Sequence, residues 1–229
     1  MKLLREVRVL LASTVVLTAT LVLLPGAVAG ASTAGFAYVN ENSFSSGYTG
    51  VQDARYDSIP SGVSGSGCAT FDSSSSQRVW QQIYIDDGNG NQLYAGTEHQ
   101  CQGYEWWFEM TVSNGHETHV WSKAISGSHK HTFSLYENSS NHLIFQVDST
   151  VESEFNLGSE YLGAYAWVGL RSTDDGNTAS SYQESNLKYQ TYELNTWNAF
   201  AGLAVPSDSN MCVAQVSGTV WDIGDNASC

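Results

Sequence analysis

The feature that most constrains the fold is a series of short runs in which apolar and polar residues alternate, with clusters of turn-forming residues between them. A period of two is the pattern of a β-strand that buries one face. The turn clusters include residues 86–91 (DDGNGN) and 113–115 (SNG), and no stretch keeps the period of an α-helix over a convincing length. These runs predict an all-β protein, an antiparallel β-sandwich, and we expect residues 30–229 to form a single domain.

The runs also predict individual strands and one hairpin. The hairpin pairs residues 131–136 with residues 143–148 across the loop ENSSNH. The segment 31–76 is rich in Gly and Ser, so we expect it to begin as an irregular or edge segment. Further strands are expected at residues 117–122, 161–171, 187–194 and 213–221, the last of them closing the fold.

Two of the runs are especially rich in aromatic residues: 79–85 (VWQQIYI) and 103–110 (GYEWWFEM). In the second run, alternation separates Tyr104, Trp106, Phe108 and Met110, which we expect in the core, from the other residues. If the two strands share a sheet, their remaining polar and aromatic side chains are expected to line one surface, made of Trp80, Gln82, Tyr84, Glu105, Trp107 and Glu109. Such a surface indicates a site for a ligand or a substrate.

The N-terminal segment has the three parts of a secretory signal peptide. Lys2, Arg5 and Arg8 precede an apolar run over residues 9–24, and the small residues of Ala-Val-Ala follow at 27–29. A membrane anchor is disfavoured, because the run is followed by small residues rather than basic ones. We therefore expect residues 1–29 to be removed and the mature protein to be secreted, extracellular, soluble and monomeric.

The mature chain is strongly acidic. Without residues 1–29 it has six basic and 22 acidic residues, a net charge of −16. Nucleic acid and anionic membrane surfaces are therefore poor partners for it. The expected partner is an extracellular glycan or a peptide ligand.

Cys68, Cys101, Cys212 and Cys229 predict two disulfides in an exported chain. Three pairings are open, and we favour Cys68 with Cys101 and Cys212 with Cys229, because each pair brackets a hairpin or a terminal loop. Zinc is disfavoured, since no close Cys-x-x-Cys pair occurs.

No cofactor and no metal site are expected. Asp87, Asn89 and Asn91 alternate as calcium ligands do, but the segment lacks the later Glu of a calcium loop, so a tight hairpin turn is favoured. His129 and His131 lie two residues apart and are interpreted as ordinary residues near the start of a strand rather than as metal ligands.

The runs 79–85 and 103–110 together resemble the glutamic peptidases (eqolisins) and their secreted bacterial relatives, which have a concanavalin A-like β-sandwich. Those proteins commonly show a Trp-x-Gln strand followed by a Tyr-Glu-Trp strand, matched here by residues 80–82 and 104–106. The resemblance spans about residues 50–200 and implies a concanavalin A-like jelly roll.

In the peptidases, the resemblance implies, a Gln and a Glu on the concave sheet act together on the substrate. The Gln is matched by Gln82. The strand that carries the Glu, often Ala-Glu-Trp, is most similar to Tyr165-Ala166-Trp167, and the side chain of Ala166 has no proton to transfer. This match predicts an eqolisin-like protein without the catalytic Glu.

A second catalytic pattern involves Glu105 and Glu109, which resemble the Glu-x-Asp-x-Glu strand of β-jelly-roll glucanases. Trp107 replaces the central Asp. Cα atoms four residues apart on a strand are about 13 Å apart, while glycoside hydrolysis needs carboxyl groups about 5 to 9 Å apart. Two solvated carboxylates beside an aromatic ring are therefore favoured over a catalytic pair.

The functional prediction is a secreted, non-catalytic protein that binds a polysaccharide or a cell-surface glycan on an aromatic-rich concave sheet. The chain has seven Trp and twelve Tyr; we expect Trp106, Trp121 and Trp197 in the core and other rings to be available for stacking. The predicted ligand-binding residues are Trp80, Gln82, Tyr84, Glu105, Trp107, Trp167 and Arg171.

Two alternatives stay open. The first is an acid-acting glutamic peptidase or glycosidase that uses Gln82 with a relocated carboxylate, for which Glu105, Glu109 and Glu160 are the candidates. The second is a structural secreted protein without a small ligand.

Overall fold

The computed structural model describes residues 36–41, 47–56, 78–100, 105–126, 128–172, 182–192, 196–206 and 211–225. Fifteen β-strands account for most of these residues. Within these ranges no helix is long and apolar enough to cross a membrane. The predicted signal peptide and the side chains of the four cysteines lie outside the described part, so both predictions stay predictions.

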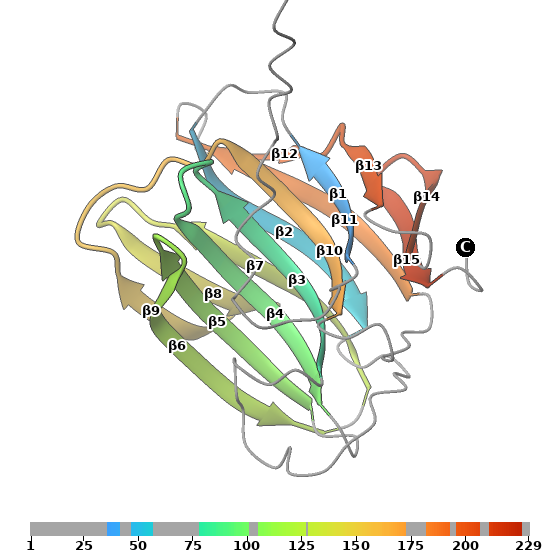
Figure 1. Ribbon diagram of the computed structural model, residues 1–229, viewed down its shortest axis with the longest axis horizontal. Helices are drawn as coiled ribbons and strands as arrows, with labels where there is room; N and C mark the ends of the chain where they lie inside the picture. The colour runs from blue at the N-terminus through green and yellow to red at the C-terminus, as the bar shows by residue number, and fades with distance from the viewer. Residues whose placement is uncertain are drawn as a thin grey trace, which may run out of the picture.

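The strands form two antiparallel sheets packed face to face (Figure 1). The seven-stranded sheet has the order β13 (Leu203–Pro206), β1 (Phe36–Glu41), β10 (Tyr165–Ser172), β3 (Arg78–Asp86), β4 (Gln92–Gln100), β5 (Glu105–Ser113) and β6 (His116–Ile125). The eight-stranded sheet has the order β14 (Met211–Ser217), β15 (Val220–Asp225), β11 (Tyr182–Thr191), β2 (Tyr48–Tyr56), β7 (Lys130–Glu137), β8 (His142–Val147) and β9 (Thr150–Asn156), with β12 (Trp197–Ala199) paired to β11. The predicted antiparallel β-sandwich is confirmed.

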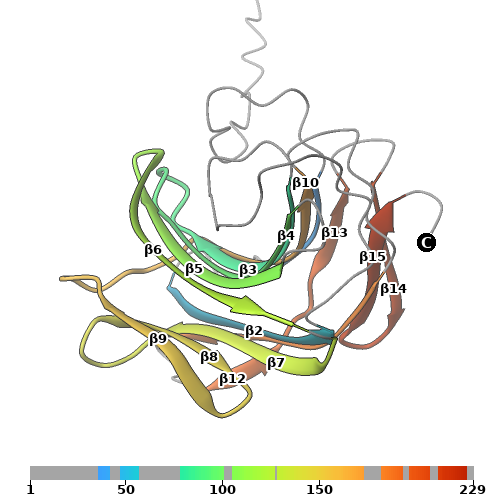
Figure 2. The same ribbon diagram turned by 90° about the horizontal axis from the view of Figure 1, so that it is seen from below.

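The core lies between the sheets and is built by alternate residues of the facing strands. Val79, Ile83 and Ile85 of β3 meet Phe133 and Leu135 of β7 there, and all five are fully buried. The seven-stranded sheet is curved in Figure 2, and we call its concave face, which is turned away from the core, the trough. A second buried cluster, rich in aromatic rings, lies on that face.

The predicted hairpin is confirmed, because β7 and β8 pair antiparallel with Leu135 opposite Phe145. The DDGNGN segment is the turn between β3 and β4, as expected, and the Asp87 carboxylate accepts hydrogen bonds from the backbone amides of Asn89 and Asn91. These local predictions succeeded because turn chemistry and alternation depend only on residues that are close in the sequence.

Three strand predictions need correction. The segment 31–76 was expected to begin as an irregular or edge segment, but its first described strand, β1, is paired on both sides, with β10 and β13. The single strand expected at 213–221 is two strands, β14 and β15, joined by a turn in which Gly218 has a φ of 48°. The strand expected at 187–194 begins earlier, at Tyr182, and ends at Thr191. In each case long-range pairing decided a boundary that the local pattern left open.

Candidate functional site

The trough is built from side chains of β1, β10, β3, β4 and β5 that the pairing register brings into rows across the sheet. The central row is Tyr38, Gly169, Gln82, Gly96 and Phe108. Gln82 therefore has a glycine on each neighbouring strand. Its side-chain amide donates a hydrogen bond of 2.7 Å to the Tyr38 hydroxyl, across Gly169.

The two glycines are required by close packing of the strands. A Cβ atom on Gly96 would lie 2.0 Å from the carbonyl oxygen of Gln81, and a Cβ on Gly169 would lie 2.6 Å from the ring of Tyr38. Neither position accepts a side chain without a shift of the backbone or a ring. The glycines hold Gln82 in a narrow space on the floor of the trough.

In the row on one side of Gln82, two charged residues flank a tryptophan. This row contains Phe36, Arg171, Trp80, Glu98 and Trp106. The indole N–H of Trp80 donates a hydrogen bond to the carboxylate of Glu98, and both side chains are buried. The guanidinium carbon of Arg171 lies 5.2 Å from the centre of the Trp80 ring, within the range of a cation–π contact.

The row on the other side of Gln82 is mostly aromatic: Asn40, Trp167, Tyr84, Tyr94 and Met110. Trp167 and Tyr84 stack with ring centres 5.7 Å apart and planes inclined by 6°. Tyr84 and Tyr94 stack with ring centres 5.1 Å apart. The floor of the trough is therefore a continuous aromatic platform.

The tyrosine hydroxyls of the platform stay protonated. Burial raises the pKa of Tyr38 to about 12, and the charge of Arg171 only partly opposes that rise. Burial also raises the pKa values of Tyr84 and Tyr94. These groups act as neutral hydrogen-bonding groups throughout the physiological pH range.

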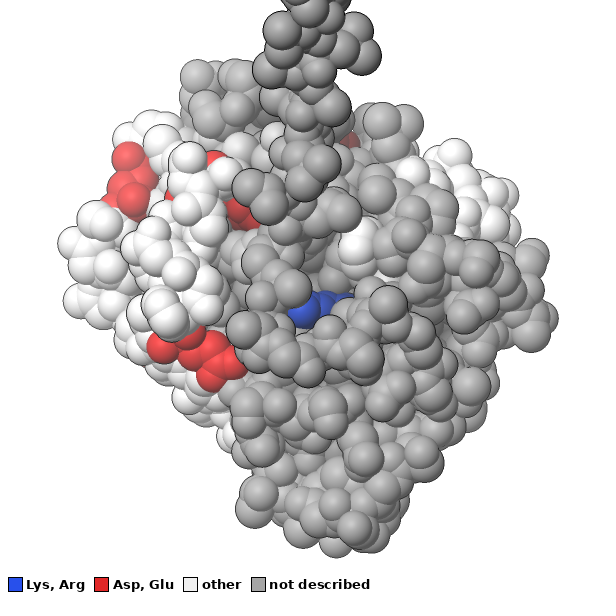
Figure 3. Space-filling model, in the orientation of Figure 1, with Lys and Arg blue, Asp and Glu red and all other residues white. Residues whose placement is uncertain are grey.

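A cavity of about 110 Å³ borders the Tyr94 end of this platform. Its walls include Trp80, Tyr94, Met110, Arg171 and Glu117, so one cation and one carboxylate flank an apolar and aromatic space. In the face-on view of Figure 3, which has the orientation of Figure 1, a small basic patch lies near the middle and the visible acidic patches lie toward one side.

The prediction of one surface shared by the two aromatic runs is wrong. The register places Met110 beside Tyr94 and Phe108 beside Gly96, so it is the predicted core face of β5 that shares the trough with Trp80, Gln82 and Tyr84. Glu105, Trp107 and Glu109 face the other sheet instead. The reason is that both faces of β5 are largely buried. The alternation of polar and apolar residues along β5 alone therefore does not reveal which of its faces belongs to the trough.

The trough therefore brings together five of the predicted ligand-binding residues and leaves out two. Trp80, Gln82, Tyr84, Trp167 and Arg171 lie on it. Trp107 packs against the core, with its ring 6.3 Å from that of Phe133, and the Glu105 carboxylate lies 3.3 Å from Nδ1 of His99.

Glu105 and Glu109 do not act as a pair, because each has a different histidine partner. Glu109 is fully buried between the sheets, with its carboxylate 3.6 Å from Nε2 of His119. Burial raises the pKa of Glu109 to about 7, although Ser153 of β9 partly opposes the rise. The interpretation of these two residues as solvated carboxylates is also corrected, since Glu109 has no exposed surface.

The three tryptophans that were expected in the core lie in different places. Trp121 packs against the core as expected. Trp106 is half-buried in the Trp80 row of the trough. Trp197 lies outside the core and contacts Tyr136, with ring centres 6.1 Å apart.

Glu98 is the carboxylate of the trough that the sequence analysis did not consider. Only its position opposite Trp80, two residues beyond Gly96, marks it as a neighbour of Gln82. Ala166, by contrast, is buried in the core between the sheets. Glu160 is exposed and lies on the connection between β9 and β10, outside the trough.

A buried polar network behind the trough was also missed. Arg55 of β2 forms an ion pair with Asp53, and both side chains are fully buried. Its other terminal nitrogen donates a hydrogen bond of 3.0 Å to the backbone carbonyl of Gln81 on the facing sheet. Nε2 of His99 lies 3.2 Å from the side-chain oxygen of Gln81. This network fixes the strand segment that presents Gln82 to the trough.

The described residues contain no cluster of three or more His, Cys, Asp or Glu side chains arranged to hold a metal ion. The rings of His129 and His131 lie 6.1 Å apart. The described side chains of the trough offer aromatic stacking, amide and hydroxyl hydrogen bonding, the guanidinium of Arg171 and the buried carboxylate of Glu98.

No family model matches the sequence, and no curated protein matches it. Among solved structures, the chain is similar to scytalido-glutamic peptidase determined with a peptide-based transition state analogue, with a TM-score of 0.55 and 12% identity over 85% of this chain and 98% of that chain. The protein thus shares the β-sandwich fold of this glutamic peptidase, in line with the eqolisin-like fold that the sequence resemblance implied.

Two glycoside hydrolase structures also match. Bacillus licheniformis β-glucanase has a TM-score of 0.39 at 10% identity, covering 78% of this chain and 66% of that chain. A native glycosidic hydrolase has a TM-score of 0.39 at 9% identity, covering 84% of this chain and 80% of that chain. Similarity at this level carries no argument about activity.

Proposed function

We propose that the protein is a secreted, non-catalytic binding protein whose trough holds a polysaccharide or a cell-surface glycan. The observation that carries this proposal is the convergence of Trp80, Gln82, Tyr84, Trp167 and Arg171 on one face of the seven-stranded sheet. Aromatic planes bind the apolar faces of sugar rings, and amide or charged groups bind the hydroxyls.

The residues of the trough divide between contact and support. Trp167 and Arg171 are partly exposed and contact the ligand, while Trp80 and Tyr84 are almost fully buried and hold the exposed groups in place. The Trp167 ring is fixed by its stack on Tyr84, and Arg171 by the face of Trp80. A platform that is ordered before binding loses little conformational entropy when the ligand arrives.

Replacing Trp167 with Ala tests this proposal. Loss of a stacking platform is expected to weaken binding to the recognised glycan about tenfold or more. Tyr56→Ala is the matched control, because Tyr56 is an exposed aromatic residue at the end of β2 on the other sheet. Binding is measured by retention on insoluble polysaccharides and by calorimetry with soluble ones. Equal affinities of the wild type and Trp167→Ala would remove the trough from glycan recognition.

A hydrolase is the second candidate, and one observation favours it. Gln82 and Glu98 share the trough face on neighbouring strands, so a Gln and a Glu lie together there as the resemblance to glutamic peptidases implies. In this alternative, Glu98 is the relocated carboxylate.

One incubation experiment distinguishes the binding protein from the hydrolase. The mature protein is mixed with denatured protein and with polysaccharides from pH 2 to pH 8, and cleavage is measured beside binding. The binding proposal expects retention without cleavage. Cleavage that is lost in both Gln82→Ala and Glu98→Gln, in variants with unchanged thermal unfolding, would instead establish an enzyme.

A further inference from the structure

A second and larger pocket lies outside the trough, at one end of the eight-stranded sheet. Its volume is about 790 Å³, within the range of small-molecule sites in proteins. The wall is assembled from β2, the end of β7 and the turn after it, the connection before β10, and the end of β11. Its principal groups are Tyr136, Glu137, Asn141, Glu160, Gln190 and Tyr192.

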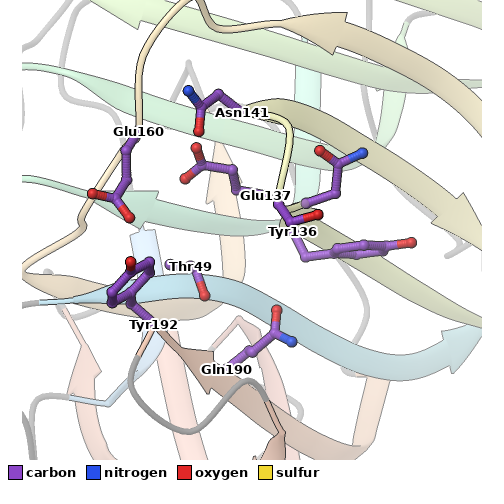
Figure 4. Close-up of a pocket in the computed structure, with 9 residues that line it drawn as sticks. Thr49, Tyr136, Glu137, Asn141, Glu160, Gln190 and Tyr192 are labelled. Atoms are coloured by element: carbon purple, nitrogen blue, oxygen red, sulfur yellow. The ribbon is translucent and has the colours of Figure 1, made fainter.

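Two carboxylates face the same space in this pocket. Figure 4 shows Glu137 and Glu160 directed into it, with Asn141 on one side and Tyr192 on the other. The backbone amide of Tyr161 donates a hydrogen bond of 3.0 Å to Oε2 of Glu137, which fixes that side chain. Oε1 of Glu137 is buried and accepts no hydrogen bond. A buried acceptor in this state is stabilised by a ligand that brings a donor.

The charge of the pocket indicates which kind of hydrogen-bond donor a ligand brings to Glu137. Among the described residues that line it, none is Lys, Arg or His. Burial raises the pKa of Glu137, and repulsion from the Glu160 carboxylate adds to this rise. A cationic group between them relieves this repulsion, whereas an anionic ligand adds to it.

The rest of the lining suits a sugar. Tyr192 is 63% exposed and offers an aromatic face at the pocket, and Tyr136 is held edge-on against Trp197. Asn138 is used within the turn after β7, where its side chain accepts hydrogen bonds from the backbone amides of Ser140 and His142. The turn is therefore ordered, and the amide of Asn141 borders the space beside Glu137.

We propose that this pocket binds an amino-sugar unit of a glycan, with its ammonium group between Glu137 and Glu160 and its ring against Tyr192. The site is separate from the trough and does not depend on the function proposed for it. Nothing in this inference requires catalysis.

The test compares two oligosaccharides of equal length that differ in one group. Glucosamine oligomers carry ammonium groups, and N-acetylglucosamine oligomers do not. Binding to the full mature chain is measured by calorimetry at about 0.15 M salt, where attraction between distant charges is screened. The glucosamine oligomer is expected to bind about tenfold or more tightly, and Glu137→Gln and Glu160→Gln are each expected to remove most of that preference.

Glu154→Gln is the matched control, because Glu154 is an exposed carboxylate of the same sheet that pairs with His142 and does not line the pocket. It removes the same charge and is expected to leave the preference unchanged. The readout is the preference for the ammonium-bearing oligosaccharide and not glycan retention as such, which separates this inference from the proposed function. Thermal unfolding checks that each variant is folded.

Three results would overturn the inference. The first is equal affinity for the two oligosaccharides. The second is an equal loss in Glu154→Gln, which would reveal general attraction to an acidic protein. The third is a lysine-containing peptide that binds as tightly as the amino sugar and depends on the same two carboxylates, which would assign the pocket to a peptide.

Discussion

At the scale of single residues, the environment of a side chain decided its chemistry more than its type did. Glu98, Glu105, Glu109 and Glu137 are all glutamates, and the structure gives them a tryptophan, two histidines and a backbone amide as partners. Only Glu98 belongs to the trough. The number of glutamates in the sequence therefore does not reveal whether two of them form a catalytic pair. The position of each glutamate across the sheet decides which side chain or backbone group it contacts.

Glu109 makes stability depend on pH. Burial raises its pKa to about 7, so its contribution to stability is fully present below pH 4.5 and is lost as the pH rises through 7. Glu109→Gln is expected to match the wild type at pH 4 and to be more stable by about 3 kcal/mol at pH 8. Urea unfolding at a series of pH values measures the difference.

His119 acts in the opposite direction and must be separated from this effect. Burial lowers its pKa, so its contribution to stability is present above pH 6.5 and is lost as the pH falls through the folded-state pKa. Because His119 lies 3.6 Å from the Glu109 carboxylate, Glu109→Gln is also compared with the wild type in a His119→Gln background, where this contribution is absent from both proteins. Parallel stability curves for the two proteins between pH 4 and pH 8 would show that Glu109 is not the responsible group.

At the scale of elements, register rather than composition built the candidate site. The runs 79–85 and 103–110 were identified as strands from their alternation; β3 contains the first, and β5 contains the second from Glu105 onward, the part that the structure describes. Strand β4 lies between them. Its pairing places Phe108 in the same row as Gln82 and Met110 in the same row as Tyr84. A shift of one residue would have exchanged the two faces of β5.

Gly96 is the position where the packing of these strands is closest. Gly96→Ala would place a Cβ against the backbone of Gln81 and Gln82, so it is expected to reduce the free energy of unfolding by about 2 kcal/mol or more. Gly115→Ala is the control, because Gly115 also has a positive φ, 78°, but has no atom near its Cβ position. Urea denaturation of both variants makes the comparison, and equal losses would assign the cost to backbone conformation alone.

At the scale of the whole molecule, Arg55 links the two sheets behind the trough, and Asp53 of the same strand is its ion-pair partner. Arg55 of the eight-stranded sheet contacts Asp53, the ring of Phe133 and the backbone of Gln81. The sequence showed Asp53 and Arg55 only as two charges in a segment rich in Gly and Ser. Their burial follows from the central place of β2, which no local pattern reveals.

Removing one partner of the Asp53–Arg55 ion pair is expected to lower the free energy of unfolding more than removing both partners. Arg55→Met leaves Asp53 buried without its cation, and we expect a loss of about 3 to 5 kcal/mol. The double variant Asp53→Leu/Arg55→Met is expected to recover a large part of that loss, because no uncompensated charge is left. Chemical denaturation of the two single variants and the double variant measures the coupling, and strictly additive losses would contradict it.

The sequence by itself determined the class of fold, the β7–β8 hairpin and the turn between β3 and β4. These features depend on alternation and turn chemistry, which act between neighbouring residues. Only the tertiary structure decided that Gln82 lies between two glycines, that Trp107 and Glu109 face the core, and that Glu137 and Glu160 share a pocket. Each of these depends on pairing between segments far apart in the chain, and several registers and several pairings satisfy the same local pattern.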